Sequence, residues 1–560
     1  MTNPDIRKFF ILSILLFIAL IGSIPRLYHL TEVPAGLMQD EAIAYDAYSV
    51  MKTGRDHHGV YFPITFQSFN DYIGHITSYT LIPFIAVWGL TPLALRLSVA
   101  ILSILTIPLI FLLVKKLTYD NTLSLMTAFI LTVSQFAVSS ARWLISPNVV
   151  PFYITSALLL FFVAIGSSKH QLIKSIIAGV SSGICLYIYP SMEGMLPVWL
   201  IILLVITILW KKRVDKDTVK KLLIISSSAF IIYLPLLREH LLRPQTITNR
   251  LNMVSVSSVH GNYLFTYFTH YLSYFPPSPL FWRGETNPTR TVSGFGYENT
   301  ALGLFFYLGL FILFFKKKFI EKKYASFSGF KLLTIQLFVI LFPIVPALTL
   351  PAGDFQRATH FLPIMVFLIS LGIIYTWEML NKFILKSNVY LFTIIILSFV
   401  ALFAYQQYNF YLTYFGSYYR GITQWYFQYG MDKVIAFTSE NERKYKNIII
   451  DNTINQPYIY VLFYKKVDPK TLTEQDYKDF SHVDPTTNWL AVSKFRNYGF
   501  RKITSENMQG AKLLKTVYNS PYSQYGIYTK GGNLIVRFEV INSNVTVSNA
   551  LISEANSVKI

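Results

Sequence analysis

Two adjacent acidic residues, Asp40 and Glu41, stand shortly after the first apolar segment of the chain. A carboxylate can remove the proton of a hydroxyl nucleophile when the two groups lie within hydrogen-bond distance. Small and apolar residues recur with helical spacing from Glu41 onward, which predicts an amphipathic helix with Asp40 at or near its N-terminus. Asp40 could be only a helix cap there, but capping does not require the second acid. We predict that Asp40 is a catalytic base and that Glu41 orients it, binds the acceptor or faces solvent.

Arginines in the polar connections between apolar segments could hold a phosphate group, because the planar guanidinium matches phosphate oxygens. The candidates are Arg55, Arg142, Arg283, Arg290 and Arg357. Arg357 ranks first, since it lies in a short connection between two apolar segments together with Asp354 and His360. The alternative for Arg357 is a side chain that only extends its charge from a helix end to the bilayer surface.

His57 and His58 follow Arg55 and Asp56 in the same polar connection as Asp40. They could help to bind an anion or a metal, or they could form a solvated turn. Two histidines with one aspartate supply no third ligand at the spacing of a metal site. A divalent metal therefore stays possible, but the sequence predicts no set of metal ligands.

Long apolar segments must position these residues. Between its charged residues, the sequence contains eleven apolar segments near the length of about 17–25 residues that a bilayer requires. They are Phe9–Pro25, Leu97–Val114, Asn121–Ala141, Val149–Ile165, Ser175–Tyr189, Met195–Trp210, Leu222–Leu237, Thr300–Phe315, Leu332–Leu350, Thr359–Trp377 and Asn388–Tyr405. The first lacks a small-residue cleavage site, so we interpret it as a retained helix and not as a signal peptide.

Lysine clusters alternate with the apolar segments and predict the orientation of the chain. With the N-terminus in the cytoplasm, the inner connections hold Lys115-Lys116, Lys169 with Lys174, Lys211 to Lys221, Lys316 to Lys323, and Lys382 with Lys386. Residues 26–96, which include Asp40, and residues 238–298 then form outer loops. If the apolar stretch from Tyr72 to Leu95 crossed the membrane, every later lysine cluster would lie on the outer side. We therefore predict an outward-facing re-entrant or interfacial helix there.

The chain is predicted to divide into a membrane domain, residues 1–407, and an α/β domain outside the cytoplasmic membrane, residues 408–560. The strand candidates in the second part are Lys446–Asp451, Asn488–Ser493, Tyr525–Lys530 and Asn533–Ile541. Helical patterns separate the first two strands, which favours an α/β arrangement. No binding motif indicates the role of this region.

The composition supports a polytopic membrane protein. Of 560 residues, 53% are hydrophobic and only 14% are charged, whereas soluble globular chains carry about 25% charge. Lysine and arginine number 49 against 29 aspartates and glutamates, but the basic clusters lie between apolar segments and face headgroups, so a nucleic-acid partner is excluded. Cys185 is the single cysteine, which excludes an intrachain disulfide.

Four motifs occur in a recognisable order near the N-terminus: Arg26-Leu-Tyr, Asp40-Glu41, TGRD at Thr53–Asp56 and GLTPLALRL at Gly89–Leu97. In this order the chain resembles the dolichyl-phosphate-mannose-protein mannosyltransferase-like family, glycosyltransferase family 39, which includes the lipid-A aminoarabinose transferases. The resemblance implies the GT-C fold class. It also implies a transferase that takes a sugar from a polyprenyl-phosphate carrier outside the cytoplasmic membrane.

The resemblance also implies roles for individual residues. The loop aspartate of the family corresponds to Asp40 and the acid after it to Glu41. Many members carry a lysine that meets the carrier phosphate, but Ile73 stands at that point of the DYIGHITSY stretch. We therefore assign the donor phosphate to Arg357, Arg55, His75 and Arg142. Substrate binding is assigned to Asp71, Tyr72 and His360. The second outer loop offers Arg142 and no acid, so no two-carboxylate metal site across these loops is predicted.

We predict an inverting glycosyltransferase that passes a sugar from a polyprenyl-phosphate donor to a hydroxyl acceptor on a protein, a lipid or a glycan. The alternative is a polytopic transporter or flippase of lipid-linked sugars or other solutes. Transporters place ionisable groups near the bilayer midplane. Here the charged residues gather in the outer loops, which favours the enzyme.

Overall fold

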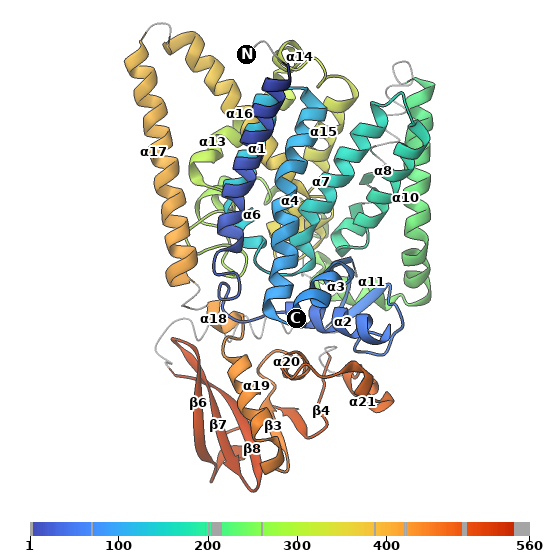
Figure 1. Ribbon diagram of the computed structural model, residues 1–560, viewed down its shortest axis with the longest axis vertical. Coiled ribbons are helices and arrows are strands. Elements are labelled where there is room, and N and C mark those ends of the chain that lie inside the picture. Colours follow the sequence, from blue (N-terminus) through green and yellow to red (C-terminus); the bar gives the residue numbers. More distant parts are fainter. Residues whose placement is uncertain are drawn as a thin grey trace. The chain divides into compact units, whose positions relative to one another are not determined.

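The chain folds into two compact units, each assembled from separate stretches of sequence (Figure 1). The computed structural model describes residues 4–68, 71–74, 76–195, 198–199, 202, 215–258, 261–385, 388–418, 421, 423–483 and 490–541. Unit 1 comprises Met1–Tyr28, Val99–Leu242 and Val254–Thr413, and unit 2 comprises His29–Ser98, Arg243–Met253 and Tyr414–Ile560. The two units are therefore not separated by a single boundary near residue 407, because residues of the first loop belong to unit 2 together with the C-terminal residues.

Unit 1 is helical. Its main helices are α1 (Pro4–Leu27), α4 (Pro92–Thr118, which begins in unit 2), α5 (Asn121–Val133), α6 (Gln135–Ser140), α7 (Ser146–Ile165), α8 (Gln171–Cys185), α10 (Lys216–Leu242), α12 (Tyr263–Leu272), α13 (Gly303–Phe315), α14 (Lys317–Lys323), α15 (Phe330–Leu341), α16 (Leu362–Leu380) and α17 (Val389–Thr413). The 3-10 helix η5 (Phe355–Phe361) leads directly into α16. α13 packs along α16, and α8 packs between α7 and α10. Most of these helices coincide with the predicted apolar segments.

The described residues contain seven helices that are long and apolar enough to cross a membrane, or eight if α13 and α14, which meet at 91°, form one span. The predicted fold class, a mostly helical membrane protein with a C-terminal sheet, is confirmed, but the predicted count of eleven spans is not. Asn121–Ala141 is broken at Ser134, whose side chain caps α6, and α8 has only 15 residues. Most of the predicted span Met195–Trp210 lies outside the described residues.

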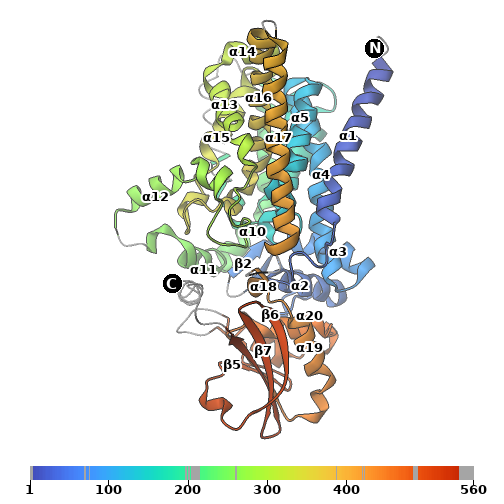
Figure 2. The same ribbon diagram turned by 90° about the vertical axis from the view of Figure 1, so that its left-hand side faces the viewer.

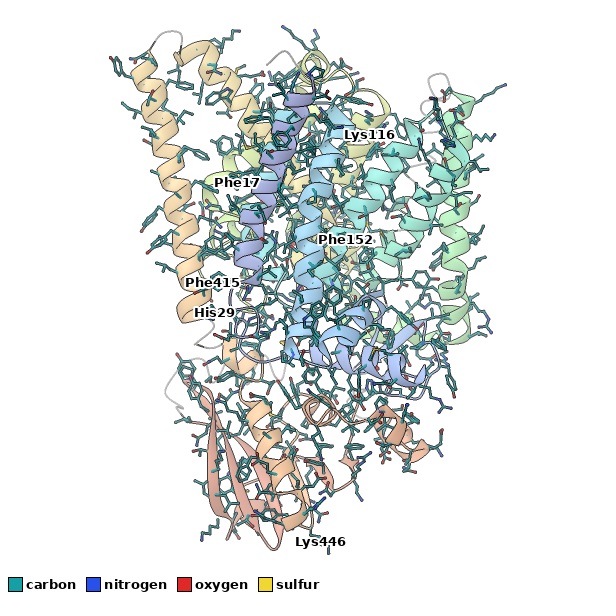
Figure 3. The ribbon with its side chains drawn as sticks, in the orientation of Figure 1. Phe17, His29, Lys116, Phe152, Phe415 and Lys446 are labelled. Carbon is teal, nitrogen blue, oxygen red and sulfur yellow. The ribbon has the colours of Figure 1, made fainter. Side chains whose placement is uncertain are left out.

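Burial distinguishes central from peripheral helices in unit 1. In its most apolar window, the span that contains η5 and α16 is 89% buried, whereas the corresponding window of α17 is 0% buried. Exposed apolar side chains such as Phe17 on α1, which is 62% exposed, project from the helices (Figure 3). Water would not tolerate so many exposed apolar side chains, but lipid does. The core of unit 1 therefore lies around α16.

Lysines gather at one end of unit 1, where α4 and α7 finish. Lys221 Nζ donates to the carbonyl oxygens of Ile165 (3.3 Å) and Ser167 (2.7 Å). Lys331 Nζ donates to the carbonyl oxygen of Lys116 at 2.9 Å, at the C-terminal end of α4 (Figure 3). Cations are favourable beside the free carbonyl groups of a helix C-terminus. The predicted inner connections that hold Lys116 and Lys221 thus lie at the same end of unit 1.

The N-terminal part of unit 2 begins with α2 (Asp40–Thr53), as the helical pattern predicted. An antiparallel hairpin of β1 (Thr65–Ser68) and β2 (Asp71–Gly74) follows, and then α3 (Ile76–Trp88). α3 has 13 residues, fewer than the roughly 17–25 residues that cross a bilayer. Among the described residues of Tyr72–Leu95, α3 is the helix that lies wholly within the stretch, and it is too short to span; the re-entrant or interfacial placement stays a prediction. Unit 2 also contains most of α11 (Gln245–Val254).

The C-terminal part of unit 2 is a six-stranded sheet in the order β4-β5-β3-β8-β7-β6. The strands are β3 (Ile448–Asp451), β4 (Lys494–Phe495), β5 (Tyr498–Arg501), β6 (Lys512–Ser520), β7 (Ser523–Lys530) and β8 (Asn533–Val540). β3 pairs parallel with β5 and β8, and all four of its residues are buried, as expected of a central strand. α19 (Met431–Glu440) and α20 (Pro457–Tyr464) lie together beside the sheet (Figure 2).

Three of the four predicted strands are confirmed, as β3, β7 and β8. The fourth, Asn488–Ser493, is wrong for its described residues 490–493, which form no strand. The chain forms the short strand β4 immediately afterwards, where Phe495 is buried and Lys494 is exposed. Residues 484–489 lie outside the described part of the chain.

We predict that cysteines placed at Lys317 and Lys446 react on opposite sides of the membrane. Both lysines are exposed (Figure 3 labels Lys446), and Cys185 is buried, so Cys185→Ala gives a silent background. A membrane-impermeant maleimide should label Lys446→Cys on intact cells or spheroplasts and Lys317→Cys only after permeabilisation. Labelling of Lys446→Cys only after permeabilisation would reverse the predicted topology.

Candidate active site

Asp40 and Glu41 are the first two residues of α2, and both are buried, with 0% and 1% of their surface exposed. The residue before them, Gln39, is left-handed (φ 67°) and its side chain makes no capping hydrogen bond. Asp40 is therefore inside the helix and is not its cap. The backbone N–H of Met38 donates to Asp40 Oδ1 at 2.7 Å. A helix N-terminus also favours negative charge.

Burial dominates the electrostatics of this acid pair. It raises the pKa of Asp40 to about 6, an effect that the charge of Arg96 reduces. Burial, and next the charge of Asp40, raise the pKa of Glu41 well above its usual value. Asp40 Oδ2 and Glu41 Oε2 are buried without a hydrogen-bond donor among the described residues. The site therefore favours the protonated form of Glu41, beside an Asp40 whose pKa is about 6.

Arg96 holds the turn that precedes α2. Its Nη1 donates to the carbonyl oxygen of Leu30 at 2.9 Å and its Nη2 to that of Gly36 at 2.5 Å. Gly36 is left-handed (φ 87°), and a Cβ there would lie 2.1 Å from the carbonyl oxygen of Phe427, so only glycine fits. The sequence did not assign Arg96 to the site, although it belongs to the GLTPLALRL motif.

Tyrosines of α20, in the C-terminal part of the same unit, surround the acid pair. The Tyr460 hydroxyl donates to the carbonyl oxygen of Leu37 at 3.0 Å. Burial, and next the charge of Glu41, raise the pKa of Tyr460 well above its usual value. Burial, and then the charges of Asp432 and Glu41, raise the pKa of Tyr464 well above its usual value. No sequence motif pointed to α20; its only signal is a short run with three tyrosines.

His57 and His58 do not form a solvated turn, because His57 is buried, His58 is half-buried, and both are hydrogen-bonded. His57 Nδ1 lies 2.5 Å from Asp46 Oδ1, and its Nε2 lies 3.1 Å from the Tyr458 hydroxyl. Burial lowers the pKa of His57, but the charge of Asp46, the hydrogen bond to Asp46 and the charge of Asp56 together outweigh burial and raise the pKa above its usual value. Burial lowers the pKa of His58. With both ring nitrogens occupied, His57 has no atom left for a metal or an anion.

Among the other predicted residues of the first loop, Arg55 and Tyr72 are half-buried. Arg55 Nη1 pairs with Glu474 Oε1 at 3.2 Å, and its Nη2 donates to the Tyr61 hydroxyl at 2.7 Å. Asp71 and Tyr72 begin β2, where Tyr72 pairs with Gln67. His75 lies outside the described residues.

In unit 1, Arg357 and Arg290 converge on one carboxylate. Arg357 Nε lies 3.2 Å from Asp354 Oδ2, and Arg290 Nη2 lies 3.7 Å from the same oxygen. Arg357 Nη1 is buried without a hydrogen-bond partner among the described residues. Burial, and next the charge of Asp354, raise the pKa of the neighbouring Glu285 to about 8. Glu285 is therefore protonated at neutral pH, and two guanidinium groups face a single carboxylate.

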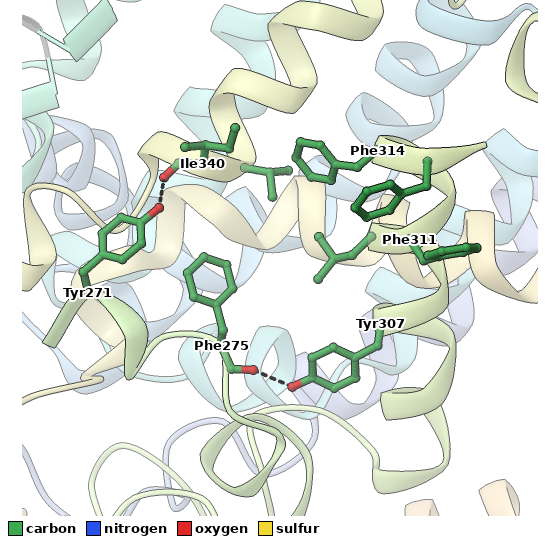
Figure 4. A pocket seen from close by; sticks show the side chains of 9 residues that line it. Tyr271, Phe275, Tyr307, Phe311, Phe314 and Ile340 are labelled. Carbon is green, nitrogen blue, oxygen red and sulfur yellow. Dashed lines mark hydrogen bonds between the residues drawn. The ribbon is translucent and has the colours of Figure 1, made fainter. Parts of the chain in front are cut away.

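Unit 1 also contains an apolar groove with a volume of about 360 Å³ (Figure 4). It is lined by Tyr271, Phe275, Tyr307, Leu310, Phe311, Phe314, Phe315, Val339 and Ile340. The two tyrosine hydroxyls turn to backbone oxygens, those of Ile340 and Phe275, which leaves the groove apolar. Between Tyr271 and Phe275 in the chain, Tyr274 donates its hydroxyl to the carbonyl oxygen of Asp354 at 3.3 Å. The groove and the arginine cluster therefore share this turn.

Arg142 and His360, two predicted site residues of unit 1, form hydrogen bonds with backbone carbonyl oxygens. Arg142 is fully buried, and its guanidinium donates to the carbonyl oxygens of Pro25 (2.8 Å) and Tyr28 (2.6 Å), at the end of α1. This contact gives Arg142 a capping role and offers no support for the predicted phosphate role. His360 Nε2 lies 3.2 Å from the carbonyl oxygen of Phe342. Within the described ranges, no group of three or more His, Cys, Asp or Glu side chains could hold a metal ion.

Comparison with known proteins gives a match to a family model over part of the chain and a similarity in fold. Residues 64–243 match the family model of the dolichyl-phosphate-mannose-protein mannosyltransferases. No curated protein matches the chain. Among solved structures, archaeal oligosaccharyltransferase AglB from Archaeoglobus fulgidus, in complex with an inhibitory peptide and a dolichol-phosphate, has a TM-score of 0.53 at 14% identity, over 82% of this chain and 64% of that one. Its apo form has a TM-score of 0.51 at 13% identity, with the same coverage.

ArnT from Cupriavidus metallidurans bound to undecaprenyl phosphate has a TM-score of 0.48 at 9% identity, over 83% of this chain and 88% of that one. The chain spans 64% of the length of AglB, so the likeness to AglB concerns the fold alone. The chain has the GT-C fold, and its resemblance to the dolichyl-phosphate-mannose-protein mannosyltransferase family is confirmed by the match over residues 64–243.

Proposed function

We propose that the chain is an inverting membrane glycosyltransferase that moves a sugar from a polyprenyl-phosphate carrier to a hydroxyl acceptor on the outer face of the cytoplasmic membrane. The observation that carries the proposal is the buried acid pair at the start of α2, in which Asp40 is the ionised partner and keeps one carboxylate oxygen without a donor. The family match over residues 64–243 supports it. The N-terminus lies in the cytoplasm and unit 2 outside.

In the proposed reaction, Asp40 Oδ2 accepts the proton of the acceptor hydroxyl while the hydroxyl oxygen forms a bond to the anomeric carbon of the sugar. The bond from that carbon to the carrier phosphate breaks on the opposite face, and its electron pair leaves with the phosphate, which inverts the anomeric centre. Glu41 keeps its proton and so adds no second negative charge beside the base. The released phosphate monoester is a stable anion, so this step requires no general acid.

The carrier itself is an amphiphile with a phosphate head and a long isoprenoid tail. Unit 1 offers a matching pair of features: the buried Arg357 with the half-buried Arg290, and the apolar groove that shares the Tyr271–Phe275 turn with them. We assign the phosphate to Arg357, whose Nη1 has no partner among the described residues, and the first isoprene units to the groove. The dolichol-phosphate bound in the AglB structure supports a donor of this class.

The rival function is a transporter or flippase. The acid pair lies in α2, outside the seven candidate spans, whereas transport sites lie near the bilayer midplane. Vesicles that contain the purified protein distinguish the two functions: the proposal requires sugar transfer from a polyprenyl-phosphate donor, and a movement of solute or lipid without transfer would replace it.

Asp40→Asn should abolish turnover while donor binding changes little. The amide keeps the size and hydrogen bonding of the side chain but cannot accept the proton, and general-base assistance is worth roughly 10²–10⁴-fold in rate. The measurement is single-turnover transfer from a panel of radiolabelled polyprenyl-phosphate sugars, together with donor binding. Glu41→Gln is the matched control. Near-normal turnover of correctly inserted Asp40→Asn would remove Asp40 as the base and point to Glu41.

The pH dependence of kcat/KM should show an acidic limb with a midpoint near 6. Burial raises the pKa of Asp40 to about 6, and a base works only when it is deprotonated, so activity is present above that pH and falls about tenfold per unit below it. A rate that stays flat from roughly pH 5 to 8 with inserted, folded protein would contradict the assignment.

Arg357→Ala should weaken donor binding as well as turnover, because the phosphate is charged before and after transfer. A hydrogen bond to a charged group contributes about 1.5–3 kcal/mol, so we expect a ten- to hundredfold rise in the donor KM, on the order of that energy. Arg357→Lys should rescue only in part, since lysine lacks the planar fork. The exposed Arg283 provides the control: Arg283→Ala should leave the donor KM unchanged.

A further inference from the structure

One peptide group connects Asp40 to the C-terminal part of unit 2. Its carbonyl, that of Leu37, accepts a hydrogen bond from the Tyr460 hydroxyl at 3.0 Å. Its N–H, that of Met38, donates to Asp40 Oδ1 at 2.7 Å. Because a peptide group is planar and rigid, a hydroxyl that holds the carbonyl also sets the direction of the N–H on the other side. Tyr460 therefore acts on Asp40 without touching it.

Local structure does not fix this peptide by itself. It lies in a turn before α2, between the left-handed residues Gly36 (φ 87°) and Gln39 (φ 67°), and belongs to no helix or strand. A non-glycine residue with positive φ is held by its surroundings and not by its own preference. Two side chains donate to carbonyl oxygens of this turn: Arg96 to that of Gly36 and Tyr460 to that of Leu37.

The environment excludes a substitute for the tyrosine hydroxyl. Leu37 and Tyr460 are each 1% exposed, and Asp40 is 0% exposed, so bulk water does not reach the carbonyl. In a buried chain of hydrogen bonds each bond polarises the next, and an N–H whose carbonyl accepts a hydrogen bond becomes a better donor. The Tyr460 hydroxyl thus both orients and strengthens the hydrogen bond that stabilises ionised Asp40.

We infer that Tyr460 is a positioning residue for the proposed base: through the Leu37–Met38 peptide, the C-terminal helix α20 holds Asp40 in its ionised, reactive form. The inference rests on the proposed function of Asp40. It gives the C-terminal part of unit 2, to which the sequence assigned no role, a direct part in the chemistry.

The groups that face Asp40 are Glu41 on its own helix, Arg96 on α4, and Tyr460 and Tyr464 on α20. Burial keeps both tyrosines protonated by raising their pKa well above the usual value. Replacement of Tyr460 by phenylalanine therefore changes no charge around Asp40. Any shift of the acidic limb must come from the weakened hydrogen bond to Asp40, and it must go to higher pH, because a less stabilised carboxylate has a higher pKa.

The test compares Tyr460→Phe with Tyr458→Phe. Both lie on α20, both are buried, and both variants lose one hydroxyl, but the Tyr458 hydroxyl meets His57 Nε2 and not the Leu37–Met38 peptide. For Tyr460→Phe we expect a kcat about tenfold lower, a donor KM within about twofold of the parent, and an acidic limb at higher pH. For Tyr458→Phe we expect the acidic limb of the parent protein.

Thermal unfolding of the two variants, followed by tryptophan fluorescence in detergent, separates positioning from a structural role. A merely structural role predicts equal losses of stability and the same kinetics for both. Equal kcat values and equal acidic limbs for the two variants would therefore overturn the inference. A second arm adds Tyr460→Phe to Asp40→Asn: because the hydroxyl acts through the carboxylate, it should cause no further loss of residual turnover, and an additive loss would also overturn it.

The failure of the inference and the failure of the proposed function give different results. If Asp40→Asn turns over normally, the proposed base is wrong, whatever Tyr460→Phe does. If Asp40→Asn is inactive while Tyr460→Phe keeps the kcat and the pH profile of the parent, the base stands and only the positioning role fails.

Discussion

Two carboxyl groups buried side by side cannot both carry a charge, because neither water nor a second cation compensates their repulsion in a medium of low dielectric constant. Asp40 and Glu41 are in this position at the start of α2. The surrounding structure affects the two acids unequally: the Met38 N–H and Arg96 favour the ionised form of Asp40, whereas burial and the charge of Asp40 favour the protonated form of Glu41.

The same constraint explains why the loop after α1 folds together with the C-terminal region. Two acids stay buried only where other side chains exclude water. α20 supplies that cover with Tyr460 at the Leu37 carbonyl, and the Tyr45 hydroxyl on α2 donates to the carbonyl of Val467 just after α20. Behind α20, the buried strand β3 anchors the sheet. The acid pair thus depends on residues from both ends of the chain.

In unit 1, two cationic side chains lie close together at one carboxylate. Arg357 and Arg290 share Asp354, and Glu285 keeps its proton, so positive charge remains in a buried place beside an apolar groove. Arg142 is also buried, but its guanidinium donates hydrogen bonds to carbonyl oxygens at the end of α1. The residue type is the same in the two cases, and the partners decide whether a guanidinium remains available to a ligand.

The sequence by itself determined what depends on near neighbours in the chain: apolar segments of bilayer length, the α2 helix with its two acids, three of the strands and the family resemblance in the first loop. It could not determine that Asn121–Ala141 breaks at Ser134 or that His57 is buried against Asp46 and Tyr458, because those outcomes depend on packing partners. The contact between Tyr460 and Leu37 joins residues 423 positions apart. Periodicity and motif spacing carry no information over that distance, so only the tertiary structure decided which side chains surround the acid pair and what each carboxyl group can do.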